Sequence, residues 1–305
     1  MQAGVLPLVN RKVLGILFGV GAGAMWAVET VLAKLLFPSF TFIQVTASEV
    51  FFATLVALPY VLMKRERVKF NSENIWNLLV VGLIGTVFAP LMYFFGLTQT
   101  FAINAALIAH LQPLFVAILG FYFLKERLHK HDFIGGVLII FAALLITSRT
   151  AENLAKFEIG NFGDLMVFFA TLCWAIVAIP GKRLTRETSS VIIVGYRFLI
   201  ASIVFIPLLL CSYQLIVNSP YQVMLGVSVG LGYIFYYEGL KRVKASQVAL
   251  TELSSPLFTA FFAGHFLGET ITPMQIIGAL LLMSGLYVLT RERSGVESSI
   301  GDTPS

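Results

Sequence analysis

The chain has 305 residues, of which 58% are hydrophobic and 12% charged, and its mean hydropathy is +0.87. Soluble domains carry about 25% charged residues, so a water-soluble fold is excluded and the bilayer must be the solvent for most of the chain. The formal net charge of +5 does not indicate nucleic-acid binding, because the basic residues form short clusters between apolar runs, as in the cytoplasmic loops of membrane proteins.

Ten apolar segments approach the roughly 20 residues that a helix needs to cross a bilayer. The first, beginning near Val13, is longer than the apolar core of a signal peptide, so we interpret it as a membrane span. The polar tail, 292–305, is expected to be disordered in the cytoplasm. The predicted spans in chain order are 13–34, 42–63, 75–97, 101–123, 132–149, 162–182, 190–211, 220–240, 245–267 and 273–290.

The loops between these segments differ sharply in charge. If the N-terminus is cytoplasmic, 17 of the 21 basic residues fall on the inner side and Arg197 alone lies within a span. The outer side then holds only Lys34, Arg149 and Lys156. By the positive-inside rule, this distribution predicts a multi-pass protein of the plasma (inner) membrane with both termini in the cytoplasm.

The two halves of the sequence resemble each other. An offset of 148 residues aligns the first two spans of each half, and an offset of 143 aligns the following spans. Each repeat therefore holds five spans, 1–149 in the first and 159–291 in the second. Because five is odd, the second repeat must enter the membrane from the opposite side. The predicted fold is all-α and integral to the membrane, with ten helices in two inverted repeats. Aligned pairs include Gly15 with Gly163, Trp26 with Trp174, Tyr93 with Tyr236, Gly96 with Gly239 and Glu126 with Glu269.

Two sequence blocks carry a family resemblance. Gln112-Pro113-Leu114-Phe115, followed by Phe123-Leu124-Lys125-Glu126-Arg127, has a second copy in Ser255-Pro256-Leu257-Phe258 and Phe266-Leu267-Gly268-Glu269-Thr270. With Met25-Trp26-Ala27 and Cys173-Trp174-Ala175, they resemble the EamA-type branch of the drug/metabolite transporter superfamily over about residues 13 to 290.

This resemblance implies a cavity framed mainly by helices 1, 3, 4, 6, 8 and 9, with helices 5 and 10 at the periphery. It also implies export or exchange of amino acids and related metabolites, often driven by ions. Many relatives carry an acidic residue before each proline, where this chain has Gln112 and Ser255, so no site is transferred from those positions.

Glu49 and Arg197 are the same position in the two repeats and carry opposite charges. Ionisable residues inside spans are costly and indicate function by default. One hypothesis is a cavity with an anionic and a cationic end, suited to a zwitterion such as an amino acid. The alternatives are an interhelical ion pair, or an Arg197 that reaches the inner headgroups.

Three further polar residues lie within predicted spans. Glu29 is a candidate for binding a substrate amine or a coupling proton, or else a polar residue near the helix end paired with Lys34. Glu252 lies in a helix that should face the cavity. His110 is either a proton relay or a hydrogen-bonded packing residue.

Aromatic residues accompany these charges, and each either contacts substrate or packs in the bundle. No catalytic or metal-binding residues are predicted. The complete predicted substrate-binding set is Trp26, Glu29, Glu49, Tyr93, His110, Trp174, Arg197, Tyr236 and Glu252.

These features favour a secondary transporter of a small polar metabolite, an amino acid or related compound, that works by alternating access as an exporter or exchanger. The sequence lacks a Walker motif, a His-Glu-x-x-His motif and a Gly-x-Ser-x-Gly motif, so we predict neither an enzyme nor a cofactor. The expected partners are a small-molecule substrate and the bilayer, without nucleic acid; a coupling proton or ion and a homo-oligomer stay open. The alternatives are a non-transporting scaffold or receptor and an intramembrane enzyme.

Overall fold

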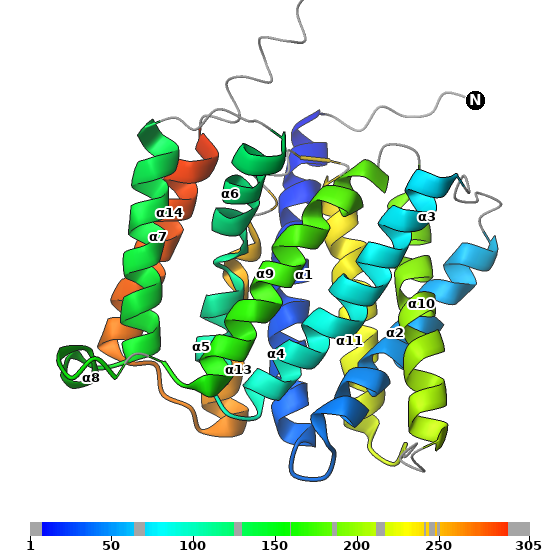
Figure 1. Cartoon of the computed structure of the whole chain (residues 1–305), viewed down its shortest axis with the longest axis horizontal. Helices are drawn as coiled ribbons and strands as arrows, with labels where there is room; N and C mark the ends of the chain where they lie inside the picture. The colour runs from blue at the N-terminus through cyan, green and yellow to red at the C-terminus, as the bar shows by residue number, and fades with distance from the viewer. Residues whose placement is uncertain are drawn as a thin grey trace, which may run out of the picture.

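A computed structural model describes residues 8–63, 71–124, 130–158, 160–184, 188–211, 217–240, 242–243, 248 and 251–291. Within these ranges all regular structure is helical, and the helices form one bundle with ten passes (Figure 1). The all-α prediction is therefore confirmed. The helices are α1 (Leu8–Leu36), α2 (Phe42–Met63), α3 (Ser72–Leu79), the π-helix η1 (Val80–Phe88), α4 (Ala89–Leu97), α5 (Ala102–Ala109), α6 (Gln112–Leu124), α7 (Lys130–Ser148), α8 (Ala151–Ala155), α9 (Phe162–Leu184), α10 (Ser190–Cys211), α11 (Pro220–Leu240), α13 (Ser254–Leu267) and α14 (Pro273–Arg291).

Most passes follow the hydropathy of the sequence closely. The bounds of α2, α10 and α11 equal the predicted spans. The third pass is continuous through α3, η1 and α4, whereas the fourth is divided into α5 and α6. The predicted start of the ninth span, near 245, lies outside the described residues.

Five helical segments of the described chain are long and apolar enough to cross a membrane, and three apolar helices are shorter. The long segments are Val13–Leu36, Phe42–Met63, Ser72–Leu97, Phe162–Gly181 and Val191–Cys211. One of the shorter segments, Ala102–Val116, runs through the division between α5 and α6.

The two ends of the described chain lie on the same side of the bundle. α1 begins and α14 ends at the top of Figure 1, and we call this side the terminal face. The other side, where α9 begins and α8 lies, is the opposite face. An even number of passes requires this arrangement.

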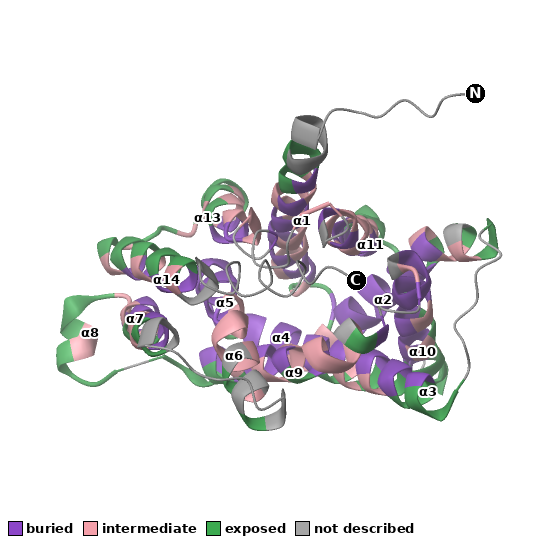
Figure 2. Cartoon of the chain, turned by 90° about the horizontal axis from the view of Figure 1, so that it is seen from above, coloured by how far each residue is buried: buried purple, intermediate pink, exposed green. Residues whose placement is uncertain are grey.

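Seen from above, α7 and α14 pack on each other at one edge of the bundle, and α2, α3 and α10 lie at the other edge (Figure 2). Between them, α1 packs against α11 and α4 packs against α9. The peripheral position that the resemblance implies for helices 5 and 10 is the position of α7 and α14.

Close backbone contacts recur at equivalent positions of the two repeats. A Cβ added at Gly96 would lie 2.5 Å from the carbonyl oxygen of Gly163, and one added at Gly239 would lie 3.3 Å from that of Gly15. Gly96 aligns with Gly239 at the offset of 143 residues, and Gly15 aligns with Gly163 at the offset of 148. The second contact is therefore the repeat equivalent of the first. Small residues are what allow helix backbones to approach this closely.

The pair α7 and α14 shows the same reciprocity. A Cβ added at Gly278 would lie 3.1 Å from the carbonyl oxygen of Ala142, and one added at Gly285 would lie 2.9 Å from that of Gly135. Since 135 aligns with 278 and 142 with 285, each contact is the image of the other. Reciprocal contacts of this kind are what a pseudo-two-fold axis between inverted repeats produces.

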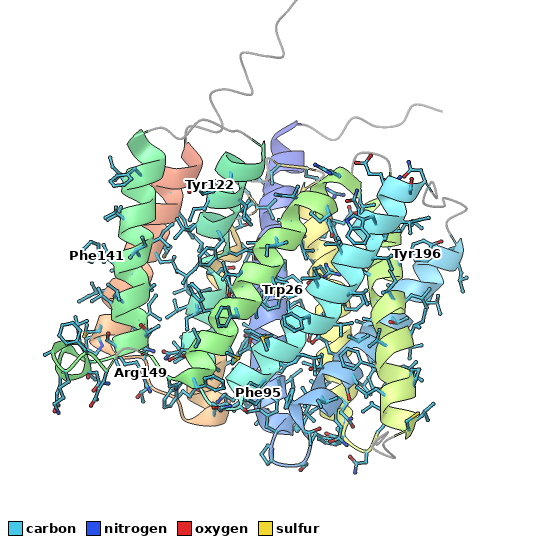
Figure 3. The ribbon with its side chains drawn as sticks, viewed as in Figure 1. Trp26, Phe95, Tyr122, Phe141, Arg149 and Tyr196 are labelled. Atoms are coloured by element: carbon cyan, nitrogen blue, oxygen red, sulfur yellow. The ribbon has the colours of Figure 1, made fainter. Side chains whose placement is uncertain are left out.

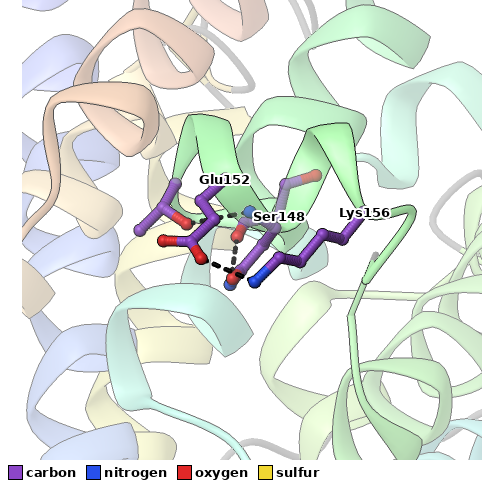
Figure 4. A network of polar contacts seen from close by, with 5 residues as sticks. Ser148, Glu152 and Lys156 are labelled. Carbon is purple, nitrogen blue, oxygen red and sulfur yellow. Dashed lines mark hydrogen bonds and ion pairs between the residues drawn. The ribbon is translucent and has the colours of Figure 1, made fainter.

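The connection between the repeats contains the short helix α8. The Thr150 hydroxyl accepts the backbone N–H of Asn153 at 3.2 Å, which caps the helix. Asn153 in turn donates to the Ser148 carbonyl at 3.0 Å, and an exposed ion pair joins Lys156 to Glu152 at 2.6 Å (Figure 4). Residue 159 and the tail 292–305 lie outside the described residues, so the predicted repeat boundaries and the disordered tail stay predictions.

Candidate functional site

The fourth and ninth passes are interrupted at equivalent positions. α5 ends at Ala109, and His110 and Leu111 form a turn before α6. In the second repeat a turn at Leu253, which aligns with His110, precedes α13. Both turns lie two to three residues before a proline, Pro113 or Pro256, and a proline supplies no backbone N–H to the preceding turn.

The two interruptions meet inside the bundle. The Nε2 atom of His110 lies 3.0 Å from the carbonyl oxygen of Glu252, and its Nδ1 atom lies 2.7 Å from that of Ala106. The imidazole therefore lies between the end of α5 and the residue just before the turn at Leu253, and a neutral ring donates to one of these two carbonyls. His110 occupies the hydrogen-bonded position that the packing interpretation requires, and it also links the two broken helices.

α1 packs directly against this junction. A Cβ added at Gly23 would lie 2.6 Å from Ser254 Oγ and 3.1 Å from the backbone nitrogen of Ser255. One turn further along, the indole Nε1 of Trp26 donates to Glu252 Oε1 at 3.1 Å. Figure 3 shows Trp26 near the centre of the bundle. The carboxylate of Glu252 thus accepts a hydrogen bond from Trp26, and its backbone carbonyl oxygen lies within hydrogen-bond distance of His110.

A second polar group surrounds the π-helix η1. The indole Nε1 of Trp174, the repeat partner of Trp26, donates to the Gly85 carbonyl at 3.2 Å. Arg197 donates to the same carbonyl through Nη2 at 3.1 Å and to Thr86 Oγ1 through Nε at 2.9 Å. π-helical segments often mark functional sites, and here one presents its carbonyl to both side chains.

Aromatic rings pack around these two groups, and we call these rings the aromatic cluster. The hydroxyls of Tyr93 and Thr30 are hydrogen bonded at 2.7 Å, and the Tyr93 and Trp174 rings lie 5.4 Å apart. The Trp26 and Tyr233 rings lie 4.8 Å apart. Tyr236 is half-buried and its ring contacts that of Tyr237 at 5.1 Å.

Two carboxylates, those of Glu29 and Glu49, act electrostatically on the Tyr93 and Tyr233 hydroxyls of this cluster. Glu29 is half-buried, whereas Glu49 is only 3% exposed and its Oε2 has no hydrogen-bond partner. The two carboxylates interact electrostatically, and Glu49 also interacts with Arg197. Among the described residues no direct ion pair joins Glu49 to Arg197. Lys34, the alternative partner of Glu29, donates to the Thr100 carbonyl.

The nine predicted residues thus divide between the helix junction, the π-helix, and the aromatic cluster with its two carboxylates. Sequence reasoning left Tyr233, Thr86 and Gly85 out of the set. Tyr233 was recognisable as an aromatic residue within a span. Thr86 and Gly85 stand in an apolar run, and no sequence signal indicates that a π-helix forms there.

A buried polar network closes the bundle at the opposite face. Asp164 accepts hydrogen bonds from the Thr100 hydroxyl and from Asn104 Nδ2, the latter at 3.3 Å, and Asn104 Oδ1 accepts from Gln275 Nε2 at 2.5 Å. The four side chains are at most 5% exposed. With Lys34 on the Thr100 carbonyl, the network joins α1, α5, α9 and α14, and we call it the polar latch.

Two positions of the latch have apolar equivalents in the other repeat. Asp164 aligns with Ile16 and Thr100 aligns with Val243, and both of these side chains are apolar. At these two positions the pseudo-symmetry of the backbone is therefore not matched by the side chains.

A separate pocket of about 150 Å³ lies between the parts of α2 and α10 near the opposite face. Its lining is almost entirely apolar, and Phe51 and Leu209 are among the residues that contribute. None of the nine predicted site residues lines it. It offers no charged group to a polar ligand.

Comparisons with known proteins agree on one family. The EamA-like transporter family matches residues 13–148 and 161–291. The chain is 32% identical over 232 residues to an uncharacterised transporter of Methanothermobacter thermautotrophicus, covering 73% of this chain and 66% of that relative, just under two thirds of its length. It is 30% identical over 274 residues to an uncharacterised transporter of Archaeoglobus fulgidus, covering 84% and 93% of the two chains.

Two further similarities extend the comparison. The pseudopaline exporter CntI of Pseudomonas aeruginosa is 25% identical over 256 residues, covering 82% of this chain and 87% of the exporter. A solved crystal structure superimposes with a TM-score of 0.63 at 18% identity, covering 93% of this chain and 98% of that one. At that identity the structure supports the fold alone.

Proposed function

Since the chain belongs to the EamA-like transporter family, we propose that it is a secondary transporter of a small polar metabolite, an amino acid or a related compound. It acts by alternating access as an exporter or exchanger in the plasma membrane, with both termini in the cytoplasm. The single observation that carries this proposal is the junction of two interrupted helices, where His110 lies 3.0 Å from the Glu252 carbonyl.

Interrupted helices suit a transport site for a physical reason. Unpaired N–H and C=O groups are tolerated at membrane depth only where they line a cavity or meet protein partners. The ends of half-helices also carry partial charges that attract polar substrate groups. At this junction the side chains of Trp26 and Glu252 stand beside the exposed ends of the helices, so charged and hydrogen-bonding groups converge there.

Inverted repeats give a simple route for alternating access. When one repeat rocks against the other, the two repeats exchange their nearly equivalent packing arrangements. The central site then opens to the opposite side of the membrane. The polar latch at the opposite face, built on Asp164 and Asn104, closes one end in this structure. The positive-inside distribution makes this face the external one, so the latch is an external gate that must open during the cycle.

The relatives support export as the direction. The pseudopaline exporter CntI is named for efflux of a metabolite, and its identity of 25% extends over 82% of this chain. The compound that CntI moves is not transferred to this chain, because one fold in this family serves different substrates. The coupling ion is proposed to be a proton carried by Glu29 or Glu252.

Flux through reconstituted protein tests the proposal. Liposomes containing the purified chain are loaded in turn with amino acids, nucleobases and sugars, and efflux and counterflow are measured against empty liposomes. We expect flux of at least one amino acid or relative, reduced about tenfold or more by Glu252→Leu, which removes the acceptor of the Trp26 indole. Glu152→Gln, at an exposed ion pair outside the bundle, is the matched control.

The scaffold or receptor alternative makes the contrary prediction. A scaffold would move no solute in the full panel, and neither substitution would alter that result. An intramembrane enzyme would convert a compound chemically instead of moving it, which mass analysis of the liposome contents detects. Either outcome would overturn the transport proposal.

A further inference from the structure

Arg197 is held by the protein itself. Its Nε and Nη2 atoms donate to Thr86 and to the Gly85 carbonyl at 2.9 and 3.1 Å, and its guanidinium carbon lies 4.2 Å from the centre of the Tyr233 ring. A guanidinium binds a carboxylate most firmly through two adjacent nitrogens. The edge formed by Nε and Nη2 is already occupied, and the side chain is only 5% exposed.

Glu49, unlike Arg197, has a side-chain atom that makes no hydrogen bond to the protein. It is as deeply buried as Arg197, yet its Oε2 has no hydrogen-bond partner. A buried carboxylate oxygen without a donor is costly and calls for a cationic or hydrogen-bonding ligand. Glu49 interacts electrostatically with Glu29 on α1 and with Arg197 on α10, so two acidic groups and one guanidinium share this region.

The surrounding rings are suited to a cation. Glu29 and Glu49 both act electrostatically on the hydroxyls of Tyr93 and Tyr233, so the four side chains belong to one region of the bundle. The Tyr233 ring also packs against Trp26 at 4.8 Å. The faces of aromatic rings attract an ammonium group, and neighbouring carboxylates attract it as well.

We infer that this transporter recognises its substrate through a cationic amino group, bound between Glu29 and Glu49 against Tyr93, while Arg197 holds the π-helix and the Tyr233 ring and binds no substrate carboxylate. The inference rests on the proposed function and narrows its substrate class to amines, with or without a carboxylate. It revises the hypothesis of a cavity in which Arg197 forms the cationic end for a zwitterion.

Compounds that differ only in their charged groups test this assignment. Leucine and phenylalanine are each compared with the decarboxylated amines, isoamylamine and phenethylamine, and with the N-acetylated acids. Binding to the purified full-length chain is measured by thermal shift, and transport by competition with counterflow. The amines are expected to bind within about tenfold of the parent amino acids, and the N-acetylated acids about tenfold or more weakly.

Variants distinguish the roles of Glu49 and Arg197 in substrate recognition. Glu49→Gln should remove the preference for compounds with a free amino group, whereas Arg197→Lys should keep that preference even if the protein becomes less stable. If Glu49→Gln does not fold, Glu29→Gln provides the same comparison from the neighbouring helix. Glu152→Gln again serves as the control and should behave as the parent protein.

Two results would count against the inference in different ways. Strong binding of the N-acetylated acids, lost in Arg197→Lys, would overturn the amine assignment while leaving transport intact. Absence of flux for every solute in the wider panel would overturn the proposed function, and the amine assignment with it.

Discussion

The hydroxyls of Thr54 and Ser202 are hydrogen bonded to each other at 2.9 Å, and these residues occupy the same position in the two repeats, 148 residues apart. A residue can contact its own repeat partner only where the pseudo-two-fold axis passes between them. The axis therefore crosses the contact between α2 and α10. At 1.5 Å per residue, Glu49 and Arg197 each lie about 7.5 Å along their helices from it, in opposite directions.

The axis contact should stabilise the fold without controlling transport. Thr54 donates to the Val50 carbonyl at 2.7 Å and so accepts from Ser202. Ser202→Ala should lower the unfolding free energy by about 0.5–1.5 kcal/mol. The double variant with Thr54→Val should lose less unfolding free energy than the two single variants lose in sum, because both changes remove the same hydrogen bond. Thermal unfolding in detergent measures this.

The matched control for that cycle is Thr46→Val. Thr46 lies on the same helix and is fully buried, and its hydroxyl donates to the Phe42 carbonyl at 2.7 Å. Its effect should add to that of Ser202→Ala within about 0.5 kcal/mol. A fully additive Thr54 and Ser202 pair would contradict the axis contact.

Glycine contacts should differ between the repeats despite their symmetry. Gly96→Ala would place a Cβ 2.5 Å from a backbone oxygen, whereas Gly239→Ala would place it 3.3 Å away. We expect Gly96→Ala to prevent stable folding or to cost about 1–3 kcal/mol, and Gly239→Ala to cost clearly less. Gly181→Ala meets no atom within 4 Å and should be neutral or stabilising. Melting temperatures of the three variants in one detergent rank them, and equal losses at Gly96 and Gly181 would refute the packing argument.

The polar latch should depend on Asn104. Asn104→Ala leaves Gln275 and Asp164 buried with fewer partners, so it should cost about 1–3 kcal/mol. It should also make the opposite face easier to open, which is measured as faster labelling of a cysteine introduced in the aromatic cluster. Thr98→Ala removes an exposed hydroxyl on the same face and should change stability by less than about 0.5 kcal/mol. Unchanged labelling in Asn104→Ala would show that the latch is not a gate.

The junction of the interrupted helices should depend on His110. His110→Leu installs the residue type of its repeat partner, Leu253, and keeps an apolar filling of the site while removing the contact to Glu252. We expect the variant to fold and its transport rate to fall about tenfold or more, because the two broken helices are no longer joined. His265→Leu, at an exposed position, is the control. Transport at the parental rate by His110→Leu would mean that the link serves packing alone.

The positions of the passes could be predicted because they depend on local composition. Apolar runs of membrane length predicted α2, α10 and α11 with their observed bounds, and the distribution of basic residues among the loops predicted that the chain ends share one face. The sequence also selected most of the interior polar residues, since a charge within an apolar run is visible without a structure.

Only the tertiary structure decided what those residues contact. That Arg197 is bound to Gly85 and Thr86, and that His110 meets Glu252, depends on how helices more than 100 residues apart are rotated and packed. The local sequence does not indicate how the helices are rotated against one another. The sequence by itself therefore determined the helical membrane bundle, through the cost of exposing polar backbone to lipid, whereas packing determined that Glu49 Oε2 is buried without a hydrogen bond.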